Sequence, residues 1–419
     1  MKKPILKSYI FTLLGITLCF AACKKDATKS KPNVGKPLVL DAIEQQKVVT
    51  DNAFSFKLFD NMAASNNTDS NLFISPLSVS FAMGMTSNGA NGATLSAIRN
   101  AMDFNNFTQA QLNAYYNNLV TNLPELDPNT TLKIANSIWY RQGFDVLPAF
   151  LSTNSTNYKA EVQALDFTSP SAVSTINDWV SNQTNGKIPS IIATIPPLEV
   201  MYLINALYFK STWKEKFDPA QTTSKPFYLA DGSQVQTKFM QADNDINGYV
   251  DNNVTVMEMP YSNSRYSMVI VEPAQGKTVD DIRAGLDSVQ WETWMSKLSP
   301  SRENIAVPKF TFSYGAKLND ALTDLGMGLA FSDTADFSLI STQDPLHITD
   351  VEQKAFIAVD ESGTEAAAVT SVGVGVTVVA APSQAYIINR PFIFAIREMS
   401  SGLILFTGIM NNPTLANTN

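Results

Sequence analysis

The chain of 419 residues is poor in the side chains that carry most hydrolytic and metal chemistry. It has one histidine, His347, so a Ser-His-Asp or Cys-His arrangement has only one candidate base. His347 lies in the alternating run 345–349, which predicts a strand residue rather than a base. A zinc site usually needs several His or Cys ligands, and the sequence shows no phosphate-binding loop, dinucleotide fingerprint or HExxH motif. These absences argue against an enzyme, a metal site and a cofactor. The 38 acidic residues leave open a hydrolase that uses two carboxylates, although no pair of acids stands out.

Cysteine is equally scarce and confined to one place. Cys19 and Cys23 lie at the end of an apolar run, residues 10–22, behind a start that carries three lysines. This is the pattern of an export signal, and the run is too short for a comfortable membrane helix. The tetrapeptide that ends at Cys23 resembles a bacterial lipoprotein box, with Phe20 where Leu is usual, and predicts a signal peptide over residues 1–22 and a lipid on Cys23. Secretion with cleavage after an alanine is the alternative.

Either form of export has consequences for the mature protein. Residues 24–37 are polar and include Pro and Gly, which predicts a flexible tether over residues 23–45 between a membrane lipid and the folded body. The body then contains no disulfide and depends on its core for stability. Removal of residues 1–22 takes away three lysines and no acids, so the formal net charge of −8 becomes −11. We therefore expect a protein of the cell envelope, cell surface or extracellular space that does not bind nucleic acid.

The most informative stretch is residues 361–382, which has no charge after Glu365 and no proline before Pro382. Alternate positions are small or β-branched, the pattern of a strand that buries one face. Gly and Ala at three of the six positions between, Ala367, Gly373 and Gly375, weaken that strand and make the segment pliable. A segment that can be both a loop and a central strand suggests a protein whose function depends on a conformational switch. The alternative is that the segment is an ordinary buried strand. The alternating set is Thr364, Ala366, Ala368, Thr370, Val372, Val374 and Val376.

The rest of the chain predicts one continuous domain, since no second linker or repeat interrupts it before residue 414. Helical patterns occur early and strand patterns occur later, which favours an α+β fold with antiparallel or mixed sheets. The predicted helices cover residues 41–62, 77–85 and 178–184, and the predicted strands cover 202–209, 254–259, 266–271, 303–312, 356–359, 392–396 and 403–409.

Over residues 46–413 the chain resembles a serpin, because many specific motifs occur in the family's order. The first motif looks like the segment that leads into the family's buried second helix, and the second like the helix over the main sheet. The third is similar to the strand and tryptophan at the top of that sheet, and the fourth to the reactive-loop hinge. The last two match the C-terminal strands. They are residues 71–78 (NLFISPLS), 177–180 with 184–188 (NDWV, TNGKI), 203–210 with Trp213 (LINALYFK), 354–356 with 361–368 (KAF, ESGTEAAA), 389–392 (NRPF) and 405–408 (LFTG).

The resemblance implies a single serpin-like domain with about nine helices around three β-sheets and an exposed reactive-centre loop. It also implies a mechanism: a protease cuts the loop, forms a covalent acyl bond to it, and is trapped when the loop inserts into the main sheet. Thr364 enters first, so a charge there is expected to stall insertion. The implied hinge residues are Glu361, Gly363, Thr364, Glu365, Ala366, Ala367 and Ala368.

Family spacing from Glu361 places the scissile bond at Thr377-Val378, with Val376 and Val379 as neighbours. These small aliphatic residues suit a shallow apolar specificity pocket and not a trypsin-like one, so elastase-like serine proteases are the expected targets. One alternative is a non-inhibitory serpin that acts as a surface carrier or structural protein. Another is inhibition of papain-like cysteine proteases, which also form acyl intermediates.

The resemblance further implies a sheet-opening region, where many relatives have a histidine and this chain has Gln353. Glutamine both donates and accepts hydrogen bonds, so the local network can survive with altered opening energetics. Residues 100–132 contain no Lys or Arg, so activation by heparin is not expected there, and the protein is expected to be a monomer. The predicted sheet-opening residues are Ser75, Ser78, Asn205, Trp213 and Gln353.

Overall fold

The computed structural model describes residues 35–66, 69–343, 345–364 and 386–418. Local sequence explains where the first helices begin. Asp41 caps α1 through a reciprocal capping box with Glu44, and Ser75 caps α2, whose first residue is Pro76. The α-helices of the described residues are α1 (Ala42–Ser65), α2 (Pro76–Ser87), α3 (Gly92–Ala101), α4 (Gln109–Asn122), α5 (Pro148–Asn157), α6 (Ala172–Gln183), α7 (Val279–Arg283), α8 (Ser288–Lys297) and α9 (Asn319–Leu322).

The described strands form one sheet of seven strands and one of nine. The seven-stranded sheet has the order β16 (Asn417–Thr418), β10 (Phe310–Lys317), β11 (Glu352–Asp360), β12 (Gly363–Thr364), β4 (Met201–Thr212), β2 (Thr131–Arg141) and β3 (Glu161–Leu165). The nine-stranded sheet has the order β1 (Leu72–Ile74), β15 (Ile404–Met410), β14 (Phe392–Glu398), β8 (Tyr266–Pro273), β7 (Val254–Pro260), β6 (Gln234–Val250), β9 (Ser299–Pro308) and β13 (Tyr386–Ile387), with β5 (Thr223–Tyr228) paired to β6.

Three sheets were expected, and the described residues form two hydrogen-bonded ones because of the long strand β6. Its first part pairs with β5, its middle with β9 and its end with β7. Because β6 pairs with all three strands, they belong to one hydrogen-bonded sheet and not to two.

Two local predictions were wrong. The expected strand over residues 303–312 is two strands, because the chain leaves the nine-stranded sheet after Pro308 and enters the seven-stranded sheet at Phe310. His347 lies in an irregular segment and not in a strand. The Ile348 amide next to it bonds the carbonyl oxygen of Ala330, so this segment is held by a helical turn instead of a neighbouring strand.

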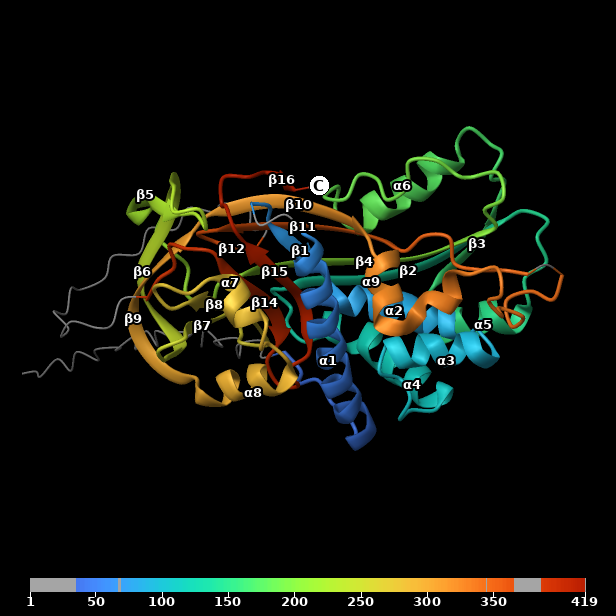
Figure 1. The fold of residues 1–419 in the computed structure, drawn as a ribbon, viewed down its shortest axis with the longest axis horizontal. Helices are drawn as coiled ribbons and strands as arrows, with labels where there is room; N and C mark the ends of the chain where they lie inside the picture. Colours follow the sequence, from blue (N-terminus) through green and yellow to red (C-terminus); the bar gives the residue numbers. More distant parts are fainter. Residues whose placement is uncertain (1–34, 67–68, 344, 365–385, 419) are drawn as a thin grey trace, which may run out of the picture. The chain divides into compact units, whose positions relative to one another are not determined.

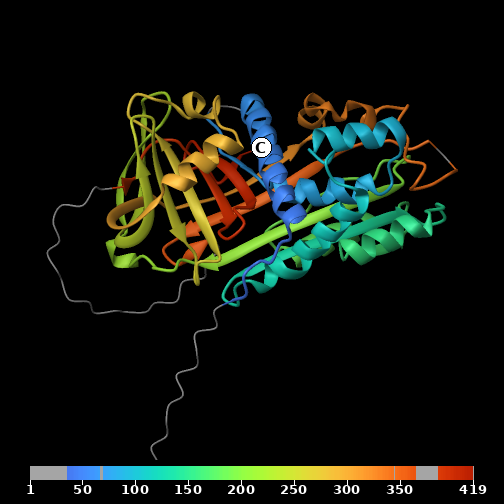
Figure 2. The same ribbon diagram turned by 90° about the horizontal axis from the view of Figure 1, so that it is seen from below.

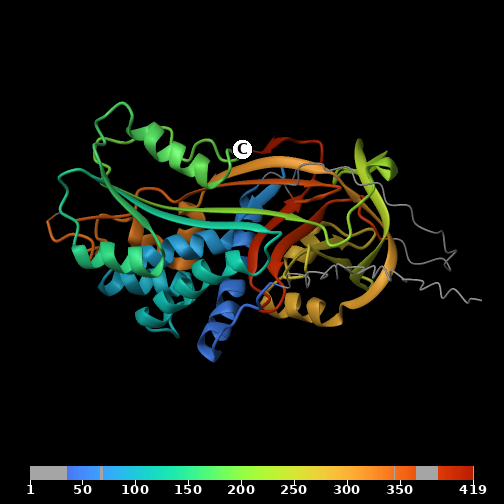
Figure 3. The same cartoon turned by 180° about the vertical axis from the view of Figure 1, so that it is seen from behind.

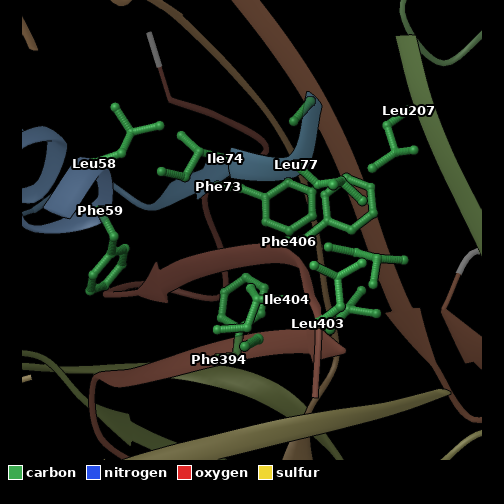
Figure 4. Close-up of a cluster of buried hydrophobic side chains, with 14 of the residues drawn as sticks. Leu58, Phe59, Phe73, Ile74, Leu77, Leu207, Phe394, Leu403, Ile404 and Phe406 are labelled. Carbon is green, nitrogen blue, oxygen red and sulfur yellow. The ribbon is translucent and has the colours of Figure 1, made fainter. Parts of the chain in front are cut away.

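The main core extends through most of the described elements, and Figure 4 shows the part of it where α1, α2, β1, β14 and β15 meet. Phe73 stacks on Phe394 and Phe406, with ring centroids 5.6 and 5.2 Å apart. Such aromatic packing buries a large apolar area and fixes the elements relative to each other. In Figure 2, α1 lies between the strands of the nine-stranded sheet and the helices α2 to α4.

The seven-stranded sheet is covered on both faces. Figures 1 and 3 show α6 on one face and α2 with its neighbouring helices on the other. A second apolar cluster joins α6 to the sheet, with Trp179 packed edge-on against Trp139 of β2 at 6.1 Å. Among the described residues, no helix has the length and apolar character needed to cross a membrane.

Candidate functional site

The site centres on the two-residue strand β12, which lies between β11 and β4 and pairs antiparallel with both. The chain leaves β11, turns at residues 361 and 362, and enters β12. Asp360 closes this turn, because its Oδ1 accepts the amides of Ser362 at 2.8 Å and Gly363 at 3.2 Å. The register pairs Gly363 with Asp360 and Thr212, and Thr364 with Val359 and Ser211.

Thr364 is buried in an aromatic setting, with 2% of its surface exposed. Its hydroxyl lies 2.5 Å from the Tyr261 hydroxyl, and the Tyr261 ring stacks on Trp213 with centroids 4.5 Å apart. Burial raises the pKa of Tyr261, so the phenol stays protonated. The indole N–H of Trp213 donates to the carbonyl oxygen of Asp360 at 2.9 Å, which links this stack to the turn.

Gly363 is required here by a close approach between backbones. A Cβ built on this residue would lie 2.0 Å from the carbonyl oxygen of Ser211 on β4, and the φ of Gly363 is 156°. Any other residue would have to move β12 away from β4.

Glu361 anchors the turn to the body of the protein through two hydrogen bonds. Lys309 donates to Oε2 at 2.6 Å and Thr222 donates to Oε1 at 2.7 Å. Burial disfavours the charged carboxylate, but these two donors outweigh burial and the pKa of Glu361 is lowered. The hinge is therefore held by an ionised carboxylate at neutral pH.

Beyond the residues that pair with β12, the facing edges of β11 and β4 have no hydrogen-bonded strand between them within the described residues. β11 pairs with β10 on its outer edge, β4 pairs with β2 on its outer edge, and only β12 bridges their facing edges within the described residues. A cavity of about 150 Å³ lies at the far end of these edges, lined by α2, by residues 199–205 and by residues 346–353. Strand edges of this kind are templates for another strand.

Four of the five predicted sheet-opening residues meet at the N-terminus of α2. Gln353, 7% exposed, clamps the backbone of Ser75: its Oε1 accepts the Ser75 amide at 3.0 Å and its Nε2 donates to the Ser75 carbonyl at 2.7 Å. Ser78 donates to the carbonyl oxygen of Asn205 at 3.4 Å. Asn205 donates to Asn136 at 2.7 Å, while its buried Oδ1 accepts from no described residue.

Trp213, the fifth predicted residue, lies apart from this cluster. The last seven residues of β4 lie between Asn205 and Trp213, and these eight steps along an extended strand span about 26 Å. It belongs to the hinge, where its amide also donates to the carbonyl oxygen of Ser362 at 2.9 Å.

A loop after α6 crosses the outer face of the sheet from β2 to β11. Lys133 of β2 donates to Oδ1 of Asn185 at 2.9 Å, and the ammonium of Lys187 lies 4.7 Å from the ring centroid of Phe356 on β11. The loop therefore contacts both sides of the facing strand edges. These contacts, like those of Tyr261, come from sequence-distant segments, and no local pattern predicted them.

Several predicted positions lie outside the described residues. These are the proposed lipid site Cys23, the scissile pair Thr377-Val378, and the hinge residues Glu365, Ala366, Ala367 and Ala368. Among the described residues, no group of three or more His, Cys, Asp or Glu side chains is arranged to hold a metal ion.

Comparison with known proteins assigns this architecture. A family model described as Serpin (serine protease inhibitor) matches residues 49–413. The chain belongs to the serpin family. Human leukocyte elastase inhibitor is 33% identical to this serpin over 364 residues, which cover 83% of this chain and 94% of that protein.

Solved serpin structures match the same fold. The thermophilic serpin tengpin in its native state has a TM-score of 0.81 and 33% identity, and the match covers 90% of this chain and 97% of that one. Human thyroxine-binding globulin has a TM-score of 0.82 and 29% identity, with 89% and 100% covered. The predicted α+β single-domain serpin fold is thus confirmed.

Proposed function

We propose that this serpin inhibits serine proteases as a suicide substrate. A target protease attacks the bond Thr377-Val378, and its serine oxygen forms an ester with the Thr377 carbonyl while the amine of Val378 leaves. The cut segment then adds as a strand between β11 and β4 before water can hydrolyse the ester. The observation that supports this most directly is that β12 already pairs with both strands, so the added strand has its first two residues in place.

The register of β12 predicts the partners of every later residue in the added strand. Because Thr364 faces Ser211 and Val359, each further step along the loop moves one step back along both β4 and β11. Continued without a bulge, this gives Ala366 opposite Phe209 and Ile357, Ala368 opposite Leu207 and Ala355, Thr370 opposite Asn205 and Gln353, Val372 opposite Leu203 and Val351, and Val374 opposite Met201 and Thr349.

The chemistry of these pairs fits insertion. The inward residues are uncharged, so none brings an unpaired charge into the sheet. Thr370 would arrive beside Asn205, whose buried Oδ1 accepts from no described residue, and its hydroxyl can donate there. Val372 and Val374 would arrive beside the cavity of about 150 Å³, where they add apolar volume to a partly apolar wall.

The target class follows from the residues at the proposed scissile bond. Thr377 and its valine neighbours suit a protease with a shallow apolar pocket, and human leukocyte elastase inhibitor is among the relatives. Elastase-like serine proteases are therefore the proposed targets, and the inhibitor acts as a monomer.

The test is incubation of the purified protein with pancreatic or neutrophil elastase, followed by a denaturing gel and mass spectrometry. A band at the summed mass, with the new C-terminus at Thr377 or a neighbouring residue, is the expected result. Fast inhibition of trypsin with none of elastase would contradict the target class.

Two other functions have specific outcomes in the same experiment. Clean cleavage without a covalent complex would favour a non-inhibitory carrier or structural protein, a role for which the fold of human thyroxine-binding globulin gives a precedent. A stable complex with papain, and none with elastase, would favour inhibition of cysteine proteases.

We also propose that the protein is exported and held at the cell envelope by a lipid on Cys23. The basic start, the apolar run and the small residues before Cys23 support this. The variant Cys23→Ser should move the protein from the membrane fraction to the soluble fraction, and equal partitioning of both forms would contradict the lipid anchor.

A further inference from the structure

The chain is fixed to the folded body at Gly35, before its first helix begins. The carbonyl oxygen of Gly35 accepts from the guanidinium of Arg265 at 2.5 Å, and a Cβ on Gly35 would lie 1.5 Å from the carbonyl oxygen of Leu126. Such a close approach between backbones requires glycine. Leu38, three residues later, is buried in the main core. The residues that precede Gly35 are therefore joined to a fixed point of the body, which is called the attachment point below.

Residues 24–36, called the basic arm below, have a charge opposite to that of the body. They contain five lysines and one acid, which gives a formal charge of +4. The chain from residue 23 onward carries −11, which leaves −15 for residues 37–419. A basic arm on an acidic protein indicates a segment that binds an anionic surface. The charged residues of the basic arm are Lys24, Lys25, Asp26, Lys29, Lys31 and Lys36.

The body is close to neutral where the basic arm joins it. The attachment point contacts segments 125–130 and 261–266. These two segments contain three charged residues, Glu125, Asp127 and Arg265. Asp127 is 1% exposed, and its carboxylate accepts two hydrogen bonds from its own segment. The exposed Glu125 is offset by Arg265, so these segments do not repel an anionic surface, although the body as a whole is acidic.

We propose that the basic arm binds the headgroups of an anionic lipid bilayer and holds the attachment point next to the membrane. Each lysine near such a surface raises the affinity about fivefold. The acidic body is repelled by the same surface, but this repulsion is screened beyond about 8 Å at physiological ionic strength. Nucleic acid also presents phosphates, but the basic arm has no aromatic residue that would stack on bases. The binding requires no lipid on Cys23 and would add to one.

The test uses the chain from residue 23 onward with Cys23→Ser, so that no attached lipid contributes. It is sedimented with vesicles of phosphatidylglycerol and phosphatidylcholine, and separately with vesicles of phosphatidylcholine alone. We expect saturable binding to the anionic vesicles, at least tenfold weaker binding to the neutral ones, and loss of binding at high salt. Removal of four arm lysines together should weaken binding at least 100-fold. These substitutions are Lys24→Gln, Lys25→Gln, Lys29→Gln and Lys31→Gln.

A matched control removes the same charge from four exposed lysines of the body and should change the affinity less than threefold. Its substitutions are Lys214→Gln, Lys216→Gln, Lys238→Gln and Lys354→Gln. Thermal unfolding of both variants establishes that the body is folded.

Four results would overturn the proposal. These are no binding to anionic vesicles, equal binding to neutral ones, an equal loss of affinity in the control variant, or stronger binding to double-stranded DNA than to anionic vesicles at the same phosphate concentration. The measurements involve neither a protease nor a lipid on Cys23, so a negative result leaves the proposed inhibition and the proposed lipid anchor unaffected.

Discussion

Thr364→Arg is the change that tests the insertion mechanism most directly. Thr364 is 2% exposed, and its hydroxyl is bonded to the buried Tyr261 hydroxyl. An arginine at this position would press a guanidinium against the buried Tyr261 on one face of the sheet, or force β12 out of the sheet. In either case the first step of strand addition becomes unfavourable, while attack on the distant scissile bond is unchanged.

The magnitude follows from the burial of the site. A buried charge without a partner costs about 3 kcal/mol or more. A barrier raised by about 3 kcal/mol slows insertion roughly 100-fold, since each 1.4 kcal/mol is a factor of ten. Hydrolysis of the acyl bond keeps its rate, so most of the variant should be cleaved and released instead of trapped.

The assay titrates a fixed amount of elastase with the inhibitor and measures the residual protease activity. The number of inhibitor molecules consumed per protease inactivated should rise at least tenfold for Thr364→Arg. The matched variant Thr364→Ser keeps the hydroxyl and should behave like the unsubstituted protein. Equal stoichiometry for the Arg and Ser variants would refute the reasoning.

Three further predictions concern the hinge and the network at α2. Glu361→Gln should lower the free energy of unfolding by about 1 kcal/mol at pH 7, because the charge-assisted bond from Lys309 is lost. The pKa of Glu361 is lowered in the fold, so its stabilising contribution is present above the ordinary value of about 4.3 and is lost as the pH falls through the lowered value. The difference in unfolding free energy between the two proteins should therefore be smaller at pH 3 than at pH 7. Gln353→Leu should cost about 2 kcal/mol in urea unfolding, because both backbone groups of Ser75 lose a buried partner. Gly363→Ala should unpair β12, because the new Cβ would lie 2.0 Å from a β4 carbonyl oxygen, and faster amide hydrogen exchange in β12 is the readout.

The pH prediction has a matched control on the surface. Lys317 and Asp350 form an ion pair at 2.8 Å with side chains 62% and 49% exposed. Lys317→Gln should change the free energy of unfolding little at either pH, because exposed ion pairs are screened by water. A loss as large as that of Glu361→Gln would mean that general charge balance, and not the hinge anchor, is measured.

Local sequence predicted many elements well because the signals lie within a few residues. The helix over 41–62 was visible from apolar spacing, and the structure begins it after Asp41, whose capping box is a local contact. The strand over 202–209 is the central part of β4. The run 303–312 looked like one strand, because the change of sheet at Lys309 depends on which neighbours each half meets. The alternation around His347 failed for the same reason, since the adjacent Ile348 amide bonds the Ala330 carbonyl oxygen of a helical turn and His347 itself lies outside the described strands.

The family, the α+β class and the uncharged alternating set from Thr364 to Val376 could be recognised in the sequence, because motif order and alternation are properties of the linear chain. Which side chains contact each other became clear only from the packing of the folded chain. The hydrogen bond between the Tyr261 and Thr364 hydroxyls joins residues 103 positions apart, and the clamp of Gln353 on Ser75 joins residues 278 positions apart. Trp213 was predicted to belong with the sheet-opening residues, and the structure places it just after β4, where its indole N–H donates to the Asp360 carbonyl oxygen at the hinge. Contacts of this kind depend on packing between distant segments, and a linear pattern carries no record of them.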